Sequence, residues 1–214
     1  MKLSDKIESI EGSKTVAFTA LIQQLRQEGR EIIDLAVGEP QFDTPAAVID
    51  ATQKALDAQK TRYSPVNGIS ELRGLLAAQF SGYDIDNILI TNGSKQALYM
   101  IFQMVCDPAD EVIIPTPFWV SFIEQVKLAG GKPVPVATKD HQLNCEAIEA
   151  AVTPRTKAIL INSPNNPSGA VYPMADLQKI ARLADDHNLF IVADEAYNAF
   201  VYDGSVPASM FDIE

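Results

Sequence analysis

Between residues 158 and 169 the chain reads Ala158-Ile159-Leu160-Ile161-Asn162-Ser163-Pro164-Asn165-Asn166-Pro167-Ser168-Gly169. This stretch predicts a short apolar strand and a loop punctuated by proline and glycine, and a helix is expected from about residue 173. A second apolar strand, Phe190-Ile191-Val192-Ala193, then leads into Asp194-Glu195-Ala196-Tyr197. A strand, a helix and a strand in this order are typical of a parallel pair, whose carboxyl ends lie side by side. We therefore expect an amide of the loop to meet a carboxylate and a phenol.

The alternation of apolar segments and helix-like segments extends upstream to residue 88. Strands are predicted at 88–91, 111–115 and 132–136, and helices at 94–106, 118–129, 144–151 and 174–186. This order predicts a three-layer α/β/α fold with a mostly parallel sheet, because short, almost wholly apolar strands are buried on both faces. Earlier helices are predicted at 15–27, 44–58 and 70–80, with an extended segment at 32–37. In the second of these helices, Thr44 is expected to cap and Pro45 to take the first helical position.

The composition argues against several functional classes. The chain has 17 basic and 28 acidic residues, and its net charge of −11 opposes binding to nucleic acid or an anionic membrane. The first residues lack the apolar core of a signal peptide, and no apolar run approaches the ~20 residues of a membrane span. The two cysteines have no CxxC spacing and the two histidines have no ligand cluster around them, so we expect reduced thiols and no metal site. A cytoplasmic location is expected.

Polar residues follow the predicted strands at the edge where parallel α/β sheets bind ligands. Ser94 stands at a helix start, where unpaired backbone amides and the helix dipole suit a phosphate, although an ordinary cap has the same sequence. Trp119 can either stack on a flat ligand or pack in the core. No GxGxxG or GxxxxGK[ST] pattern supports a dinucleotide or Walker-type site.

The two strand ends quoted first predict a holder for an aromatic nitrogen heterocycle that carries a ring hydroxyl. Asn166 lies between prolines and offers a neutral amide that can donate to a phenolate oxygen. Asp194 follows four apolar residues, where a carboxylate needs a cation such as a protonated pyridine nitrogen. Tyr197 can reach the same ring oxygen, whereas Glu195 should point the opposite way. Turn formation by Asn166 and helix capping by Asp194 are the simpler alternatives.

With these segments the chain resembles the class I aspartate/aromatic aminotransferases, which are fold-type I pyridoxal-phosphate enzymes. The resemblance is carried by Ala36-Val37-Gly38-Glu39-Pro40, Phe42-Asp43-Thr44-Pro45, Tyr63, Gly68 to Arg73, Gly93-Ser94-Lys95-Gln96-Ala97-Leu98, Pro117-Phe118-Trp119 and the two strand ends. It implies pyridoxal-phosphate-dependent transfer of an amino group from an amino acid to a 2-oxo acid. It also implies an N-terminal arm with a small-domain segment at 1–43, and a pyridoxal-phosphate-binding large domain at 44–214 that is incomplete at its C-terminus.

The resemblance gives the cofactor ring four partners. Trp119 would stack on the pyridine ring, and Asp194 would pair with its nitrogen. Asn166 and Tyr197 would bond the ring hydroxyl oxygen.

The resemblance also implies contacts to the phosphate and to the substrate. Ser94 and Lys95 would hold the cofactor phosphate, and Tyr63 would reach the phosphate of a neighbouring subunit, which implies a homodimer. Gly38 would contact the substrate carboxylate, with Trp119 and Asn166 beside it.

The catalytic lysine of the family pattern is missing, and so is the family's arginine for the substrate α-carboxylate. The family's lysine, which forms an imine with the cofactor and moves the α-proton, follows the Asp-x-x-Tyr strand in a Ser-Lys motif, whereas the last lysine here is Lys179. We therefore expect the chain to be the N-terminal portion of a longer aminotransferase, to contain no catalytic residue and to be inactive alone. The predicted strand 88–91 would then lack its neighbours.

Three other functions are compatible with the same cofactor residues. A related pyridoxal-phosphate lyase or cyclopropane-forming synthase shares them and differs mainly in its substrate contacts. A non-catalytic pyridoxal-phosphate-binding domain is a further alternative. The presence of Asn166, Asp194 and Tyr197 argues against a protein that lost its function long ago, since such a protein would be expected to lose these residues. A cofactor-sensing transcription regulator is disfavoured, because residue 1 already begins the arm and the chain is acidic.

Overall fold

The computed structural model describes residues 4–8, 10, 12, 14–34, 38, 42–202, 204 and 206–213. The chain divides into two compact units. One is Gly12–Ile90, and the other consists of Met1–Glu11 together with Thr91–Glu214. The domain boundary predicted between residues 43 and 44 stays a prediction.

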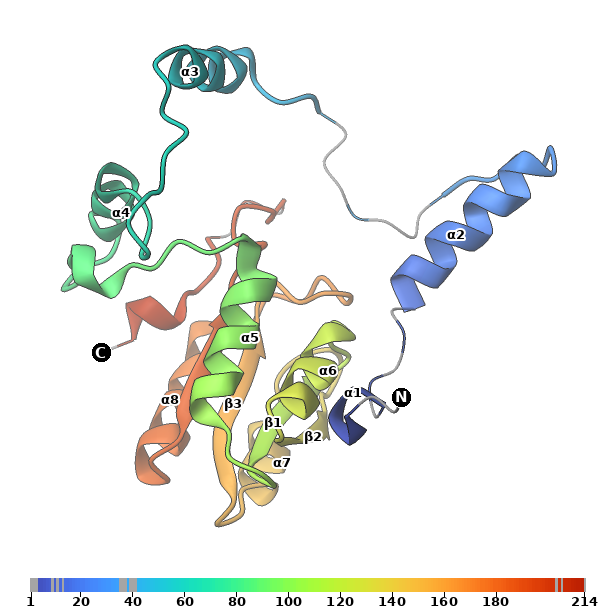
Figure 1. Ribbon diagram of the computed structural model, residues 1–214. Coiled ribbons are helices and arrows are strands. Elements are labelled where there is room, and N and C mark those ends of the chain that lie inside the picture. The colour runs from blue at the N-terminus through green and yellow to red at the C-terminus, as the bar shows by residue number, and fades with distance from the viewer. Residues whose placement is uncertain are drawn as a thin grey trace. The chain divides into compact units, whose positions relative to one another are not determined.

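A four-stranded sheet forms the centre of the unit that contains Thr91–Glu214. Its strands are β1 (Glu111–Thr116), β2 (Lys132–Ala137), β3 (Thr156–Asn162) and β4 (Phe190–Asp194). They lie in the order β2-β1-β3-β4, and every neighbouring pair is parallel (Figure 1). The predicted α/β fold with a parallel sheet is confirmed, and these strands differ from their predicted bounds by at most two residues.

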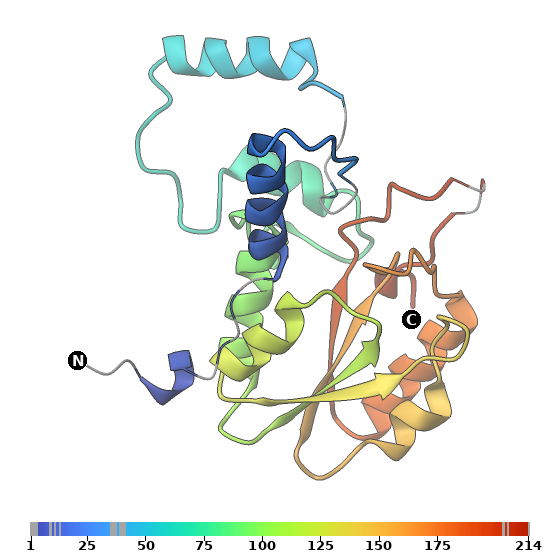
Figure 2. The same ribbon diagram turned by 90° about the vertical axis from the view of Figure 1, so that its right-hand side faces the viewer.

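Helices cover both faces of the sheet (Figures 1 and 2). Helices α5 (Gly93–Val105) and α6 (Ser121–Leu128) pack on one face, and α7 (Cys145–Ala150) and α8 (Met174–Asp186) pack on the other. The first core contains Leu98, Phe102, Phe122, Val126, Val112, Ile114, Leu160 and Val192. The second contains Ile113, Ile159, Ile161, Ile148, Tyr172, Leu177, Ile180 and Leu183. Successive strand residues enter opposite cores, as the two-residue period of a strand requires.

The unit Gly12–Ile90 is helical in its described part. It contains α2 (Lys14–Gln27), α3 (Ala46–Asp57), α4 (Ser70–Ala77) and the 3-10 helix η1 (Ile85–Asn87). The Thr91–Glu214 part of the other unit ends with the 3-10 helix η2 (Met210–Asp212), and the short helix α1 (Asp5–Glu8) also belongs to that unit.

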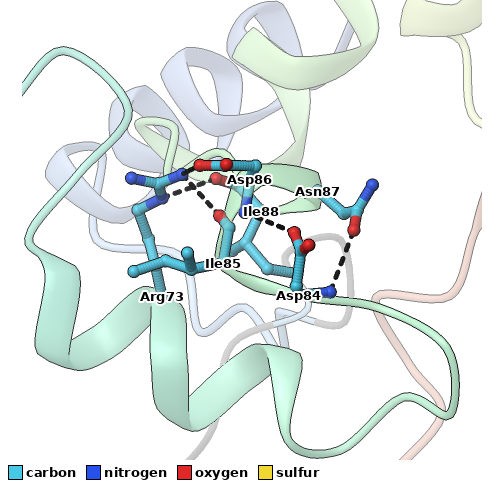
Figure 3. A network of polar contacts seen from close by, with 6 residues as sticks. All are labelled: Arg73, Asp84, Ile85, Asp86, Asn87 and Ile88. Atoms are coloured by element: carbon cyan, nitrogen blue, oxygen red, sulfur yellow. Dashed lines mark hydrogen bonds and ion pairs between the residues drawn. The ribbon is translucent and has the colours of Figure 1, made fainter.

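The buried guanidinium of Arg73 ties α4 to η1 (Figure 3). Its Nε donates to the carbonyl oxygen of Ile88 at 2.8 Å, and its Nη2 donates to the carbonyl oxygen of Ile85. The carboxylate of Asp86 lies 3.6 Å from Nη2 and is almost fully exposed. Because a buried charge needs several partners, these carbonyls account for an arginine that sequence reasoning had treated only as part of a motif.

Several local predictions are wrong. The predicted strand 88–91 does not form, because no described strand pairs with these residues. The backbone N–H of Ile90 donates instead to the carbonyl of Asn67 at 3.0 Å. Pro45 is the N-cap residue of α3, so Thr44 does not cap that helix. Helix α6 begins at Ser121 and not at residue 118. Of the predicted extended segment, residues 32–34 belong to no helix or strand and 35–37 lie outside the described residues, so that segment stays a prediction.

The described residues also bear on membrane insertion and metal binding. No helix among them is long and apolar enough to cross a membrane. No group of three or more His, Cys, Asp or Glu side chains among them could hold a metal ion.

Candidate functional site

The carboxyl ends of β3 and β4 place two buried polar residues on the same face of the sheet. Asn162 and Asp194 are partners in the register of the two strands. Leu160 and Val192, two residues earlier, belong to the core under α5 and α6. Side chains two residues apart in a strand share a face, so Asn162 and Asp194 lie on the α5/α6 face. Trp119 packs against the same core.

The loop after β3 is fixed by side chains that point inward. Ser163 Oγ accepts a hydrogen bond from the backbone N–H of Tyr172 at 3.0 Å. Asn165 Oδ1 accepts from the hydroxyl of Ser168 at 2.7 Å and from its N–H at 3.2 Å. Ser163 and Asn165 are both buried, so their bonds satisfy the loop internally. The side chain of the neighbouring Asn166 takes no part in these bonds.

The side chain of Asn166 meets the last tyrosine of the predicted holder. Asn166 Nδ2 donates to Tyr197 Oη at 3.4 Å, a long hydrogen bond between two partly exposed groups. The two residues follow neighbouring strands, so the predicted meeting of an amide and a phenol is present.

Asp194 is a buried carboxylate with few partners. Its side chain is 8% exposed, and Oδ1 accepts a single hydrogen bond, from the N–H of Ala196 at 3.2 Å. Among the described residues no cation pairs with it and its other oxygen has no donor. Burial raises the pKa of Asp194, with a smaller contribution from the charge of Glu195, while the bond from Ala196 acts in the opposite direction. A carboxylate in this state favours a cationic or strongly donating ligand.

Glu195 faces the opposite way, as predicted. Its carboxylate accepts from Ser209 Oγ at 2.8 Å and from the N–H of Met210 at 2.9 Å. It thus holds the start of η2, whose Met210 packs against the core under α7 and α8. The direction of the Glu195 side chain was predictable from the sequence, whereas its hydrogen-bond partners were not.

Lys95, on α5, contacts Trp119, which follows the end of β1. The ammonium of Lys95 lies 4.7 Å from the centroid of the Trp119 ring, and Phe122 contacts the same ring edge-to-face at 5.4 Å. The buried side chain of Gln125 donates to the carbonyl of Lys95 at 2.9 Å. Nothing in the sequence distinguished Gln125 from an ordinary helix residue.

The start of α5 is open to an anion. Gly93 has a φ of +76°, a conformation that glycine adopts without strain, and Ser94 beside it is exposed. The side chain of Asn92, the N-cap residue, accepts no bond from the helix. The first backbone amides of α5 therefore have no side-chain acceptor from the cap, which suits a phosphate.

The remaining two predicted site residues belong to the unit Gly12–Ile90. Tyr63 is fully exposed. Gly38 is also exposed, and a Cβ built on it would meet no atom within 4 Å. Their roles stay predictions.

Comparison with known proteins decides the family. The family model "Aminotransferase class I and II" matches residues 30–213. The chain belongs to this family. The aspartate/prephenate aminotransferase of Thermus thermophilus is 44% identical over 210 residues, which are 94% of this chain and 54% of that protein. The aspartate aminotransferase of Bacillus subtilis is 40% identical over 218 residues, 98% of this chain and 56% of that protein.

Solved aminotransferase structures confirm the fold. The Thermus thermophilus aspartate aminotransferase with maleate has a TM-score of 0.93 at 42% identity, and the match covers 97% of this chain and 56% of that one. The Thermotoga maritima aspartate aminotransferase has a TM-score of 0.93 at 38% identity, covering 99% and 58%. This aminotransferase chain thus spans about half the length of the relatives that it matches. The cofactor of the family is pyridoxal 5'-phosphate, as the resemblance implied.

Proposed function

We propose that this chain supplies the pyridoxal-phosphate holder of an aminotransferase that moves an amino group between an amino acid and a 2-oxo acid. The observation that carries the proposal is the buried Asp194, without a cationic partner in the described part of the chain, beside the Asn166–Tyr197 pair. The donor set fits the cofactor, because a pyridinium nitrogen offers the missing cation and a ring oxygen can accept from Asn166 and Tyr197. When bound, pyridoxal phosphate supplies an electron sink for the charge released at the α-carbon.

The other predicted residues complete the proposed holder. Ser94 and Lys95 bind the phosphate at the start of α5, chiefly through backbone amides that point out of the helix. Trp119 offers one face of its indole ring to the pyridine ring. The contact between Lys95 and Trp119 supports this arrangement, because it brings the phosphate-binding turn next to the stacking ring.

Substrate contacts and assembly belong to the same proposal. Gly38 receives the substrate carboxylate, and Tyr63 reaches the phosphate bound by a second subunit. Trp119 and Asn166 are likewise assigned to substrate binding. The full exposure of Tyr63 supports an intermolecular role. A homodimer and a cytoplasmic location follow from the proposed enzyme class. The relatives named above are all aminotransferases, so they lend no support to the lyase, synthase or non-catalytic alternatives.

The only tryptophan of the chain is Trp119, so intrinsic tryptophan fluorescence reports on this site alone. We expect added pyridoxal phosphate to quench the emission saturably, because an absorbing ring stacked on indole takes up its excitation. Inorganic phosphate should compete. Asp194→Ala should weaken binding by about tenfold or more, the effect of losing a charge-assisted hydrogen bond. Asp186→Asn, which also removes one negative charge at an exposed position, is the matched control. Quenching that does not saturate, or that is equal in the two variants, would refute the proposal.

A further inference from the structure

A buried amide at the end of β3 touches both halves of the proposed ring holder. Asn162 is 5% exposed. Its Oδ1 accepts a hydrogen bond from the backbone N–H of Asn166 at 2.8 Å, and its Nδ2 donates to the backbone carbonyl of Asp194 at 3.0 Å. One side chain thus connects the residue that offers an amide to the ring with the residue that offers a carboxylate.

The position of Asn162 explains why a side chain is needed there. It is the last residue of β3 and is paired in register with Asp194, the last residue of β4. Beyond that pair the chain leaves the sheet. In the described part of the chain, one further backbone link joins the two strand ends, from the N–H of Ser163 to the same Asp194 carbonyl at 3.2 Å. The sheet itself therefore does not fix the distance between Asn166 and Asp194.

The chemistry of the link restricts it to a short carboxamide. The group must accept from one backbone N–H and donate to one backbone carbonyl at the same time. Aspartate keeps the acceptor and loses the donor, and leucine has the size but neither function. The bond to Asp194 is buried and the bond from Asn166 is partly buried, so water does not easily replace them.

We propose that Asn162 is a positioning residue that locks Asn166 to Asp194 and so fixes the spacing between the two ring contacts. The identity of the ligand rests on the proposed function, whereas the lock itself does not. If Asn162 only satisfied buried polar groups, its removal would lower stability without changing the ionisation of the bound ring. If it positions Asn166, its removal should weaken the donor to the ring oxygen and so raise the pKa of that hydroxyl.

The test uses the whole chain with three substitutions. Asn162→Leu removes both bonds, and Asn162→Asp keeps an acceptor for Asn166. Ser163→Ala is the matched control, because it removes one buried hydrogen bond, to Tyr172, from the same loop and leaves Asn166 and Asp194 untouched. The first readout is amide hydrogen exchange at Asn166 without cofactor, and the second is the pH midpoint at which the absorption of bound pyridoxal phosphate changes from its phenol to its phenolate form.

Asn162→Leu should accelerate exchange of the Asn166 amide by about tenfold or more, since that amide loses its acceptor. It should also raise the phenol midpoint by about one pH unit, the size of one hydrogen bond to a charged oxygen. Asn162→Asp should keep the Asn166 amide protected, and Ser163→Ala should change neither readout. Equal exchange and equal midpoints in Asn162→Leu and Ser163→Ala would overturn the proposal, as would loss of protection in Asn162→Asp.

Two further outcomes remain decisive. If the unsubstituted chain binds no pyridoxal phosphate, the proposed function fails, and hydrogen exchange alone decides whether Asn162 holds Asn166. If the Asn162 variants do not fold, the side-chain amide resonance of Asn162 is followed by NMR in the unsubstituted chain. A shift on addition of pyridoxal phosphate, larger than that of the equally buried Asn165 amide, supports the lock, and an unchanged resonance contradicts it.

Discussion

The ammonium of Lys95 lies over the ring of Trp119, 4.7 Å from its centroid. This contact occupies one face of the indole, since cations are attracted to the negative face of an aromatic ring. A flat ligand must therefore stack on the opposite face or displace the ammonium. In either case the charge of Lys95 remains close to the start of α5, where the phosphate is proposed to bind.

Replacing Lys95 should show how much its charge contributes. Lys95→Met should weaken binding of pyridoxal phosphate about three- to tenfold at low ionic strength, because one favourable charge near the phosphate is lost. The difference should shrink as salt screens the charge. Fluorescence titration of Trp119 in low and high salt measures it. Lys127→Met, on α6 and paired with Glu124, is the control, and a salt-independent loss in Lys95→Met would point to packing instead of charge.

Asp194 should stabilise the complex while destabilising the unliganded chain. Because burial raises its pKa above the ordinary 3.8, the folded chain holds the proton more tightly than the unfolded chain. Ionisation of Asp194 therefore costs stability as the pH rises from about 3.8 through the folded pKa, and the cost is complete once the pH exceeds that folded pKa. Asp194→Asn should raise the unfolding free energy at pH 7 by about 1 kcal/mol and weaken cofactor binding. Denaturant unfolding with and without pyridoxal phosphate tests both parts, and a less stable unliganded variant would contradict this account.

Glu111 should give the sheet a stability that acid removes. Its buried carboxylate accepts from Lys132 Nζ at 2.9 Å and from Thr153 Oγ1 at 2.6 Å. The hydrogen bond from Lys132, then that from Thr153, lowers the pKa of Glu111 below its ordinary 4.5. The stabilisation is therefore full above pH 4.5 and is lost as the pH falls through the lower folded pKa.

The substitution Glu111→Gln should lower the unfolding free energy at neutral pH by about 1 to 2 kcal/mol. It should also flatten the acid limb of the stability profile, measured by urea unfolding between pH 3 and pH 7. Glu149→Gln, at an exposed position of α7, is the control. If the unfolding free energy falls equally steeply with acid in both variants, Glu111 is not the cause of the acid sensitivity.

Arg73 should be essential to the unit Gly12–Ile90, whereas its ion pair with Asp86 should not (Figure 3). Arg73→Met leaves the partly buried carbonyl of Ile88 without its side-chain donor and should cost about 2 to 3 kcal/mol. Asp86→Asn breaks only an exposed pair and should cost less than about 0.5 kcal/mol. Chemical denaturation compares the two variants, and equal losses would mean that the ion pair, and not the carbonyl contacts, stabilises this region.

The sequence predicted the sheet well because its signals are local. The central strands β1 and β3 are short, largely apolar runs, and burial on both faces leaves little ambiguity about their type. Residues 88–90 are equally apolar in pattern but form no strand. A strand exists only with a partner, and no local pattern states whether a neighbour is present.

The part of the candidate site that was predictable consists of polar residues at strand ends whose side-chain chemistry suits a specific ligand group. Asn166, Asp194 and Tyr197 stand at strand ends, and the structure brings Asn166 to Tyr197. Asn162 and Gln125 were missed because their partners are backbone groups distant in sequence. Any backbone carbonyl can accept such a bond, so the sequence carries no sign of which one does.

Asp194 and Glu195 are neighbours with opposite assignments, one on the proposed cofactor face and one anchoring Ser209 and Met210. The two side chains have different partners because successive residues of an extended chain point to opposite faces. An insertion or deletion of an odd number of residues would change which face each side chain occupies. Deletion of one residue within β4 would move Glu195 into the place of Asp194, and insertion of one residue would move Asp194 into the place of Glu195. Selection should therefore tolerate altered side chains along β4 more readily than an altered count of residues.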